Sequence, residues 1–118
     1  MKKVISLVLL LVCAAFLGCA QAEALDSAAV GSAVAFGSYE QGNGQIPIEW
    51  IVLDRQEDRV LLLSKYALDA RPFHEVEDRD VTWVDCTLRG WLNGDFFNGA
   101  FSDEERAQIV QVTNATAN

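Results

Sequence analysis

The hydrophobic pattern in the middle of the chain predicts three β-strands, over residues 33–36, 46–54 and 59–65. In the second of these stretches, IPIEWIVLD, apolar side chains fall on both faces of the strand, and RVLLLSK in the third has the same character. The polar residues 55–58 form the turn, so that the two strands pair as an antiparallel hairpin inside a larger sheet. A hairpin that is apolar on both faces needs other parts of the protein to cover each side.

The pattern becomes helical in the second half of the chain. The i, i+3, i+4 spacing of a buried helical stripe is formed by Leu88, Trp91 and Leu92. This helix begins at Asp85 or Thr87, either of which is a good N-cap, and Asn93-Gly94 is a typical stop signal. A second short helical piece carries three phenylalanines, Phe96, Phe97 and Phe101. A third begins at the capping-box sequence 102–105 and ends near Ile109, which gives an α+β domain of an antiparallel hairpin or sheet followed by short helices.

Residues 1–22 form a signal peptide rather than part of the fold. Two lysines precede an apolar run over residues 4–17, which fits a secretory core of about 7–15 residues and falls short of the roughly 20 that span a bilayer. Ala20-Gln21-Ala22 is a small-x-small cleavage site that releases a soluble protein. Alternatively, Phe16-Leu17-Gly18-Cys19 resembles a bacterial lipobox, with cleavage before Cys19 and lipid on that cysteine. Both alternatives place the product outside the cytoplasm.

Removal of this segment changes the charge of the chain. The 118 residues carry 9 Lys and Arg against 17 Asp and Glu, a net charge of −8. Two of the basic residues are the N-terminal lysines, so the remainder has 7 basic residues and a net charge of −10. This acidity excludes a typical nucleic-acid binder, which needs a concentrated basic surface. Residues 23–32 are small and polar and predict a flexible tether, and residues 33–118 then form the domain.

Residues with catalytic or metal-binding chemistry are few. Cys86 is the one cysteine after the export segment, so an internal disulfide and a structural zinc site are both excluded. Its place beside the helical stripe favours a buried structural cysteine. His74 is the one histidine, and we interpret it as a surface residue. The sequence therefore predicts no catalytic set, no metal site and no cofactor.

Five residues are candidates for contacting a ligand: Tyr39, Glu49, Asp69, Arg71 and Trp83. Glu49 interrupts an apolar strand, so it either pairs with a basic side chain or is an acid with a raised pKa in a pocket. The basic residues available for such a pair are Arg59, Lys65, Arg71 and Arg89. Asp69 and Arg71 flank a turn, where Asp usually binds backbone amides. Trp83 either stacks on a sugar or peptide or packs inside the fold.

Four motifs, in order along the chain, resemble those of a bacterial domain family of unknown function found in secreted, lipid-anchored or zinc-ribbon-bearing proteins. They are FGSY at 36–39, PIEWIVL at 47–53, LLLSKYALD at 61–69, and Trp83 followed by CTLRGWLN at 86–93. The resemblance covers residues 33–113 and implies a fold related to the C-type-lectin-like domain of formylglycine-generating enzymes. Those enzymes rely on a cysteine pair that this domain lacks, so their activity is not carried over. Family members continue well beyond the end of this sequence, so the resemblance implies the N-terminal half of such a domain.

Together these features predict an exported, non-catalytic binding or interaction module, attached to the membrane by lipid at Cys19 or released as a secreted or periplasmic protein. Its expected ligand is an unknown protein or glycan. Two alternatives stay open. One is a truncated remnant without independent function, and the other is an acid–base enzyme that uses Glu49 and Asp69.

Overall fold

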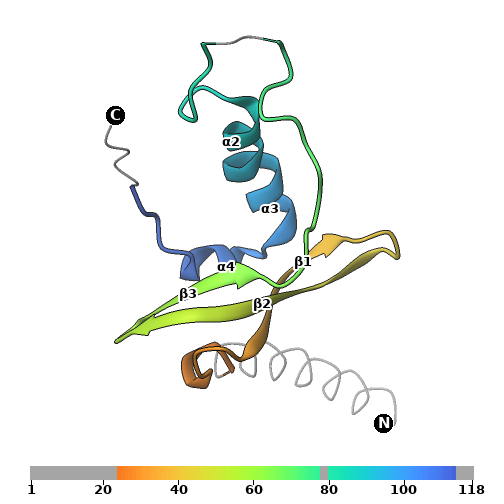
Figure 1. The fold of residues 1–118 in the computed structure, drawn as a ribbon. Coiled ribbons are helices and arrows are strands. Elements are labelled where there is room, and N and C mark those ends of the chain that lie inside the picture. Colours follow the sequence, from red (N-terminus) through yellow and green to blue (C-terminus); the bar gives the residue numbers. More distant parts are fainter. Residues whose placement is uncertain (1–23, 78–79, 114–118) are drawn as a thin grey trace, which may run out of the picture. The chain divides into compact units, whose positions relative to one another are not determined.

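The computed structural model describes residues 24–77 and 80–113 (Figure 1). The chain divides into two compact units. One consists of the residues up to Phe36 together with Ile48–Tyr66, and the other of Gly37–Pro47 together with the residues from Ala67 onward. The predicted signal peptide and Cys19 lie outside the described residues.

Three strands form one antiparallel sheet in the order β1-β2-β3 (Figure 1). They are β1 (Ala33–Glu40), β2 (Gln45–Gln56) and β3 (Arg59–Ser64). The α+β prediction of a sheet followed by short helices is therefore confirmed. The first two strands are longer than the sequence predicts, because β1 continues past Gly37 to Glu40 and the connecting turn is confined to residues 41–44.

The β2–β3 hairpin has one irregularity in its register. Ile51 pairs with Leu63, whereas Asp54 pairs with Leu61, so Leu53 is an extra residue on β2. Such a β-bulge bends the strand that carries it and leaves the partner strand regular. The connecting turn contains Glu57, which adopts a left-handed φ of 41°.

The apolar core of the first unit lies on one face of the hairpin. Ile48 and Val52 of β2 are fully buried, and Val34 and Phe36 of β1 are almost fully buried. Trp50 supports this packing, because its Nε1 donates a hydrogen bond to the backbone oxygen of Phe36 at 2.6 Å. This tryptophan is a structural residue.

The opposite face of the hairpin is exposed, contrary to the prediction that both faces are covered. Leu53, Leu61 and Leu63 retain 46%, 58% and 53% of their accessible surface. The exposure alternates along β3, so the strand has one half-buried face and one solvent-facing face. β3 therefore has more apolar side chains than the described residues of the chain bury.

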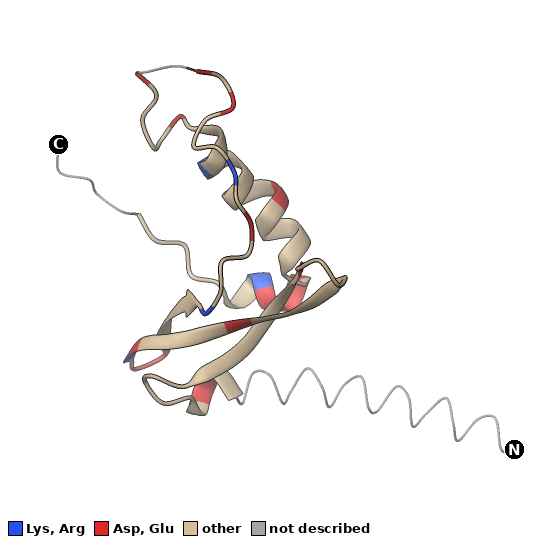
Figure 2. Cartoon of the chain, turned by 45° about the vertical axis from the view of Figure 1, so that its right-hand side comes forward, with Lys and Arg blue, Asp and Glu red and all other residues tan. Residues whose placement is uncertain are grey.

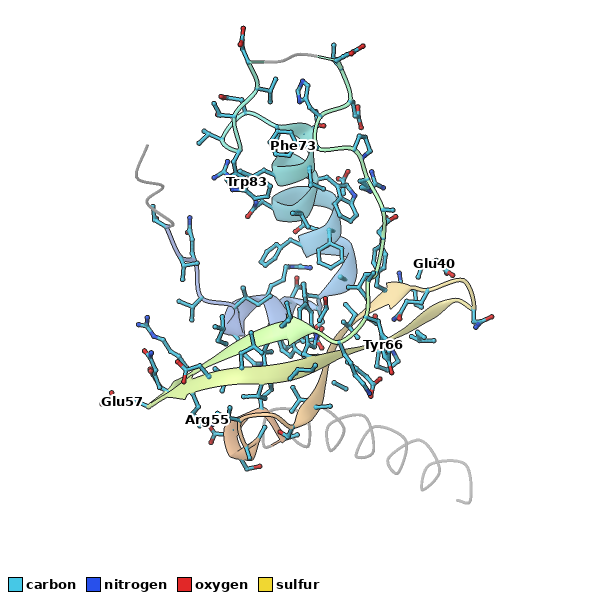
Figure 3. All side chains as sticks on the ribbon, in the orientation of Figure 1. Glu40, Arg55, Glu57, Tyr66, Phe73 and Trp83 are labelled. Carbon is cyan, nitrogen blue, oxygen red and sulfur yellow. The ribbon has the colours of Figure 1, made fainter. Side chains whose placement is uncertain are left out.

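Residues 24–32 are structured where the sequence predicts a flexible tether over 23–32. Residues 24–27 are helical. The backbone of the segment then pairs with β2, since Val52 accepts from the Gly31 N–H at 2.8 Å and donates to the Ser32 oxygen at 3.0 Å. The Arg55 guanidinium also donates to backbone oxygens of this segment, which fixes it to the hairpin (Figure 3).

In the second unit, one helical stretch runs through the predicted stop at Asn93-Gly94. It consists of α2 (Thr87–Trp91), the π-helical turn η1 (Leu92–Phe96) and α3 (Phe97–Ala100) (Figure 1). The stop prediction is therefore wrong. Neither Asn93 nor Gly94 adopts the left-handed conformation of a helix C-cap, and the Asn93 side-chain amide donates back to the Arg89 oxygen at 2.9 Å.

The N-cap of α2 is Cys86, where the sequence predicts Asp85 or Thr87. The Cys86 sulfur accepts the Arg89 N–H at 3.4 Å, which satisfies one of the unpaired donors of the first turn. Only 3% of Cys86 is exposed, so the prediction of a buried structural cysteine is confirmed. Burial and capping are combined in a single side chain.

The last helix, α4 (Asp103–Gln108), follows the sequence prediction. Ser102 accepts the Glu105 N–H at 3.2 Å, and the Glu105 carboxylate accepts the Ser102 N–H at 2.8 Å, which completes the predicted capping box. The second carboxylate oxygen of Glu105 accepts the N–H of Gly37 at 2.9 Å. One glutamate therefore links the helix start to β1.

Candidate functional site

The end of β1 places Tyr39 against the helical stretch of the second unit. Its ring lies 5.2 Å from that of Phe96 and 6.4 Å from that of Trp91, the latter in an edge-on geometry. The rings of Trp91 and Phe96 are themselves 5.2 Å apart. These contacts form a three-ring aromatic group that is partly open to solvent.

The π-helical turn explains how Trp91 and Phe96 meet. In an α-helix, side chains three and four positions apart are neighbours, whereas residues five apart diverge. The i→i+5 winding of η1 brings positions 91 and 96 onto one side of the helix. Single π-helical turns occur frequently at functional sites, so this irregularity marks the aromatic group as a candidate site.

Asp69 joins this aromatic group to the segment that follows β3. Its Oδ2 accepts a hydrogen bond from the Tyr39 hydroxyl at 2.7 Å and another from the Arg71 Nε at 3.3 Å. Its Oδ1 accepts the Ala70 N–H at 2.7 Å, as predicted for an aspartate at a turn. Asp69 therefore fixes both the tyrosine and the arginine.

Arg71 lies over the ring of Trp91, with its guanidinium carbon 4.1 Å from the centroid of the ring. This is a cation–π contact, and the Asp69 carboxylate orients the guanidinium from the side. Arg71 keeps 40% of its side-chain surface exposed. We call these five residues, Tyr39, Asp69, Arg71, Trp91 and Phe96, the Tyr39 cluster.

The hydrogen bond between Tyr39 and Asp69 shifts the pKa values of the two side chains in opposite directions. It lowers the pKa of Asp69 below its usual value, with help from the Ala70 N–H, because it stabilises the ionised carboxylate. The same bond raises the pKa of Tyr39, since ionisation of the phenol would remove the donor. Asp69 is therefore a carboxylate at neutral pH and Tyr39 a neutral donor.

Of the five predicted ligand-contacting residues, three meet in this cluster and two lie elsewhere. Glu49 belongs to the first unit, where it forms an exposed ion pair of 3.3 Å with Lys65, one of its predicted partners. Trp83 lies in the loop before α2 and stacks against Phe73 at 6.3 Å, with both rings about half exposed (Figure 3). Cys19, the predicted lipidation site, is outside the described residues.

The sequence missed Trp91 and Phe96 as site residues. Their spacing resembles that of fully buried helical positions, whereas both are only partly buried. The one available signal was the aromatic pair five residues apart across Asn93-Gly94, which fits neither a continuous α-helix nor a helix stop. His74, predicted to be a surface residue, is partly buried and accepts the Thr87 N–H through Nδ1 at 3.2 Å.

The acidic residues of the chain are spread over β2, the loop before α2 and α4 (Figure 2). Within residues 24–77 and 80–113, no three histidine, cysteine or carboxylate side chains come together as a potential metal site. No helix in that part of the chain is long and apolar enough to cross a membrane. The Tyr39 cluster is therefore the most developed group of polar and aromatic side chains that the described residues contain.

The family model "Domain of unknown function (DUF6273)" matches residues 57–118, more than half of the chain. Comparison with the curated proteins and with the solved structures gave no match. The matched residues include β3, the turn with Asp69 and Arg71, and all the helices of the second unit. The chain belongs to this family of domains of unknown function.

Proposed function

We propose that this protein is an exported, non-catalytic interaction module, anchored to the membrane by lipid at Cys19, that binds another protein through the Tyr39 cluster. Tyrosine, tryptophan and arginine are the residue types that dominate the energetics of protein–protein interfaces. Here one of each is gathered in a single group that is partly open to solvent. This composition favours a protein partner over a glycan.

The observation that carries the proposal is the fixed, exposed Arg71. Its guanidinium is held between the Trp91 ring and the Asp69 carboxylate, and Asp69 is held by Tyr39. Immobilising a flexible side chain on binding costs about 0.5–1.5 kcal/mol, and a side chain that is already ordered avoids that cost. The contact with Asp69 uses Nε, and a guanidinium has further N–H donors that suit a carboxylate or a backbone carbonyl of a partner.

The same contacts support binding rather than acid–base catalysis. A general acid at neutral pH needs a raised pKa, whereas the pKa of Asp69 is lowered. Glu49 is exposed and paired with Lys65, so it lacks the buried setting in which a carboxyl group becomes a general acid. Neither carboxylate has the environment of a proton donor.

Photo-cross-linking of the full-length chain in its own cells tests the proposal. A photoreactive phenylalanine analogue at Phe73 lies two residues from Arg71. We compare the chain without further change with Arg71→Gln and Lys65→Gln. Lys65 is the matched control, because it also pairs with a carboxylate and lies 5.1 Å from an aromatic ring, that of Tyr66.

We expect one defined envelope protein to be cross-linked in the parent chain and in Lys65→Gln, and lost in Arg71→Gln. Cross-linking that is identical in all three chains would show that the Tyr39 cluster is not the interface. A cross-linked polysaccharide in place of a protein would overturn the choice of partner. Thermal unfolding of each variant checks that the fold is retained.

Export and lipidation are tested separately, by metabolic labelling with palmitate. The full-length chain should incorporate the label, and Cys19→Ala should not. Label-free chain that is recovered outside the cytoplasm would support cleavage at Ala20-Gln21-Ala22 and a soluble product. Unlabelled chain that stays in the cytoplasm would contradict export itself.

We also infer that the domain is related to the C-type-lectin-like fold. The four sequence motifs support this relation, as does the order of an antiparallel sheet followed by short helices. An experimental structure of a longer family member tests it. A strand order in that structure that differs from the lectin-like one would refute the relation.

A further inference from the structure

β3 is an edge strand whose own sequence has none of the usual protections. It occupies the end of the order β1-β2-β3, and no other strand of the described residues lies on its far side. Natural edge strands avoid pairing with other chains by means of prolines, bulges or charged residues in mid-strand. Between Arg59 and Lys65, β3 has the sequence VLLLS, and the bulge of this hairpin lies on β2 instead.

The backbone groups of this free edge can be assigned from the ladder. The backbone N–H of Lys65 donates to the backbone oxygen of Glu49 at 2.9 Å, so the backbone groups of residue 65 point toward β2. Because the direction of the backbone hydrogen bonds alternates along an antiparallel strand, the N–H and C=O groups of Leu61 and Leu63 also point toward β2. The N–H and C=O groups of Val60, Leu62 and Ser64 therefore point away from the sheet, toward a strand that could pair there.

One face of the hairpin next to this free edge also carries exposed apolar side chains. Leu61 and Leu63 are more than half exposed, and Leu53 of β2 is nearly so. A strand added beside β3 would cover the outer flanks of Leu61 and Leu63 with its own side chains. It would leave Leu53 on the second strand in largely the same environment.

We propose that β3 pairs antiparallel with β3 of a second copy of this chain, so that two three-stranded sheets join into one continuous sheet. A twofold axis perpendicular to the sheet requires a residue to face its own copy at the centre. With Leu61 at the centre, the outward backbone groups of Val60 and Leu62 bond reciprocally across the junction. Leu61 then contacts Leu61 of the copy, and Leu63 packs on the aliphatic part of Arg59.

Charge favours this register over the one centred on Leu62 and favours a second copy as the occupant. Centring on Leu61 brings the acidic turn of Glu57 and Asp58 beside Lys65 of the copy, and the twofold axis repeats this opposite-charge contact. Centring on Leu62 instead sets Arg59 directly opposite Lys65 twice, and like charges in that position are destabilising. The acidic turn before β3 and the lysine after β3 thus complement those of a second copy.

Sedimentation of the full-length chain in mild detergent tests the proposal. We expect a dimer for the parent chain, and a mass that falls to one chain for Leu61→Lys, which places two ammonium groups together at the axis. Leu53→Lys is the matched control, since it charges the same exposed face away from the edge and should remain dimeric. Circular dichroism checks the folding of both variants.

Oxidative cross-linking gives a second readout that does not depend on a destabilising change. Non-hydrogen-bonded pairs across antiparallel strands bring their Cβ atoms close enough for a disulfide. Leu61→Cys should therefore form a disulfide-linked dimer that the parent chain and Val112→Cys do not form. Parent chain that is monomeric at every concentration, or a dimer that persists in Leu61→Lys but is lost in Leu53→Lys, would overturn edge pairing. The inference is independent of the proposed function, because the Arg71→Gln variant should dimerise normally.

Discussion

Gly37 is the position at which a single methyl group should do the most damage to the second unit. Its φ is +70°, a left-handed conformation that side chains other than glycine rarely adopt. A Cβ at this position would lie 2.5 and 2.6 Å from two ring carbons of Phe101 and 2.8 Å from the Ala100 oxygen. The ring could rotate away, but the backbone oxygen belongs to α3 and can move only with the helix. The change Gly37→Ala therefore combines backbone strain with a steric overlap.

The two effects add to a large part of the stability of a small domain. A left-handed φ costs a non-glycine residue about 1–2 kcal/mol. An added methyl group in a packed region costs about 1–3 kcal/mol more. The sum of about 2–5 kcal/mol compares with a total stability of about 5–15 kcal/mol for a typical domain. The N–H of Gly37 also donates to Glu105, so any backbone shift weakens the link to the capping box of α4.

Gly44→Ala separates strain from overlap. Gly44 has a φ of +95°, and no atom lies within 4 Å of the place where its Cβ would be. It should therefore lose only the strain energy of about 1–2 kcal/mol. Urea unfolding of the full-length chain, followed by tryptophan fluorescence, gives both free energies of unfolding. If Gly37→Ala costs no more than Gly44→Ala, the close approach of Phe101 and α3 to β1 is refuted.

Three further predictions concern caps, protons and the buried thiol. Ser102→Ala should lower the free energy of unfolding by about 1 kcal/mol. Glu105→Ala should lower it by more, because the glutamate accepts two backbone N–H groups while the serine accepts one. Urea unfolding of the two variants compares these losses. Because the folded-state pKa of Asp69 lies below its unfolded value, its contribution to stability is present above the unfolded pKa and is lost as the pH falls through the folded pKa. Asp69→Asn should thus destabilise the protein at neutral pH and progressively less in acid, and in an NMR titration Tyr39→Phe should raise the pKa of the Asp69 carboxyl. Cys86 should resist alkylation in the native chain and react once urea unfolds it, as peptide mass spectrometry can show; rapid native labelling would contradict its burial.

The features that the sequence predicts well are those encoded by local signals. The capping box at Ser102 needs only residues three positions apart, and the structure has both of its hydrogen bonds. The three strands are likewise found near the predicted positions, because strong apolar runs separated by polar turns identify strands without further information. The family match covers part of the same region, namely β3 and the helices.

The Tyr39 cluster could be predicted only in part, because it is assembled from distant segments. Tyr39 and Asp69 are 30 residues apart, and no periodicity indicates that the hydroxyl of one reaches the carboxylate of the other. Trp91 and Phe96 come together through a π-helical turn where Asn93-Gly94 resembles a helix end. Contact with Tyr39 favours the longer helix, and this stabilisation arises from tertiary packing rather than from the local sequence.

The mismatch on β3 has a different origin and leads to a different conclusion. An apolar pattern reports every surface that a strand buries, whether the neighbour belongs to the same chain or to another one. Leu61 and Leu63 fit the predicted two-sided strand, yet they are exposed in the single chain, beside an edge whose backbone groups are unpaired. Phe73 and Trp83 are also exposed, but they lie in a loop, so they offer no backbone ladder for a second chain. The pattern and the structure are reconciled if the missing neighbour of β3 is another strand, and the self-complementary charges of Glu57, Asp58 and Lys65 identify that strand as β3 of a second copy.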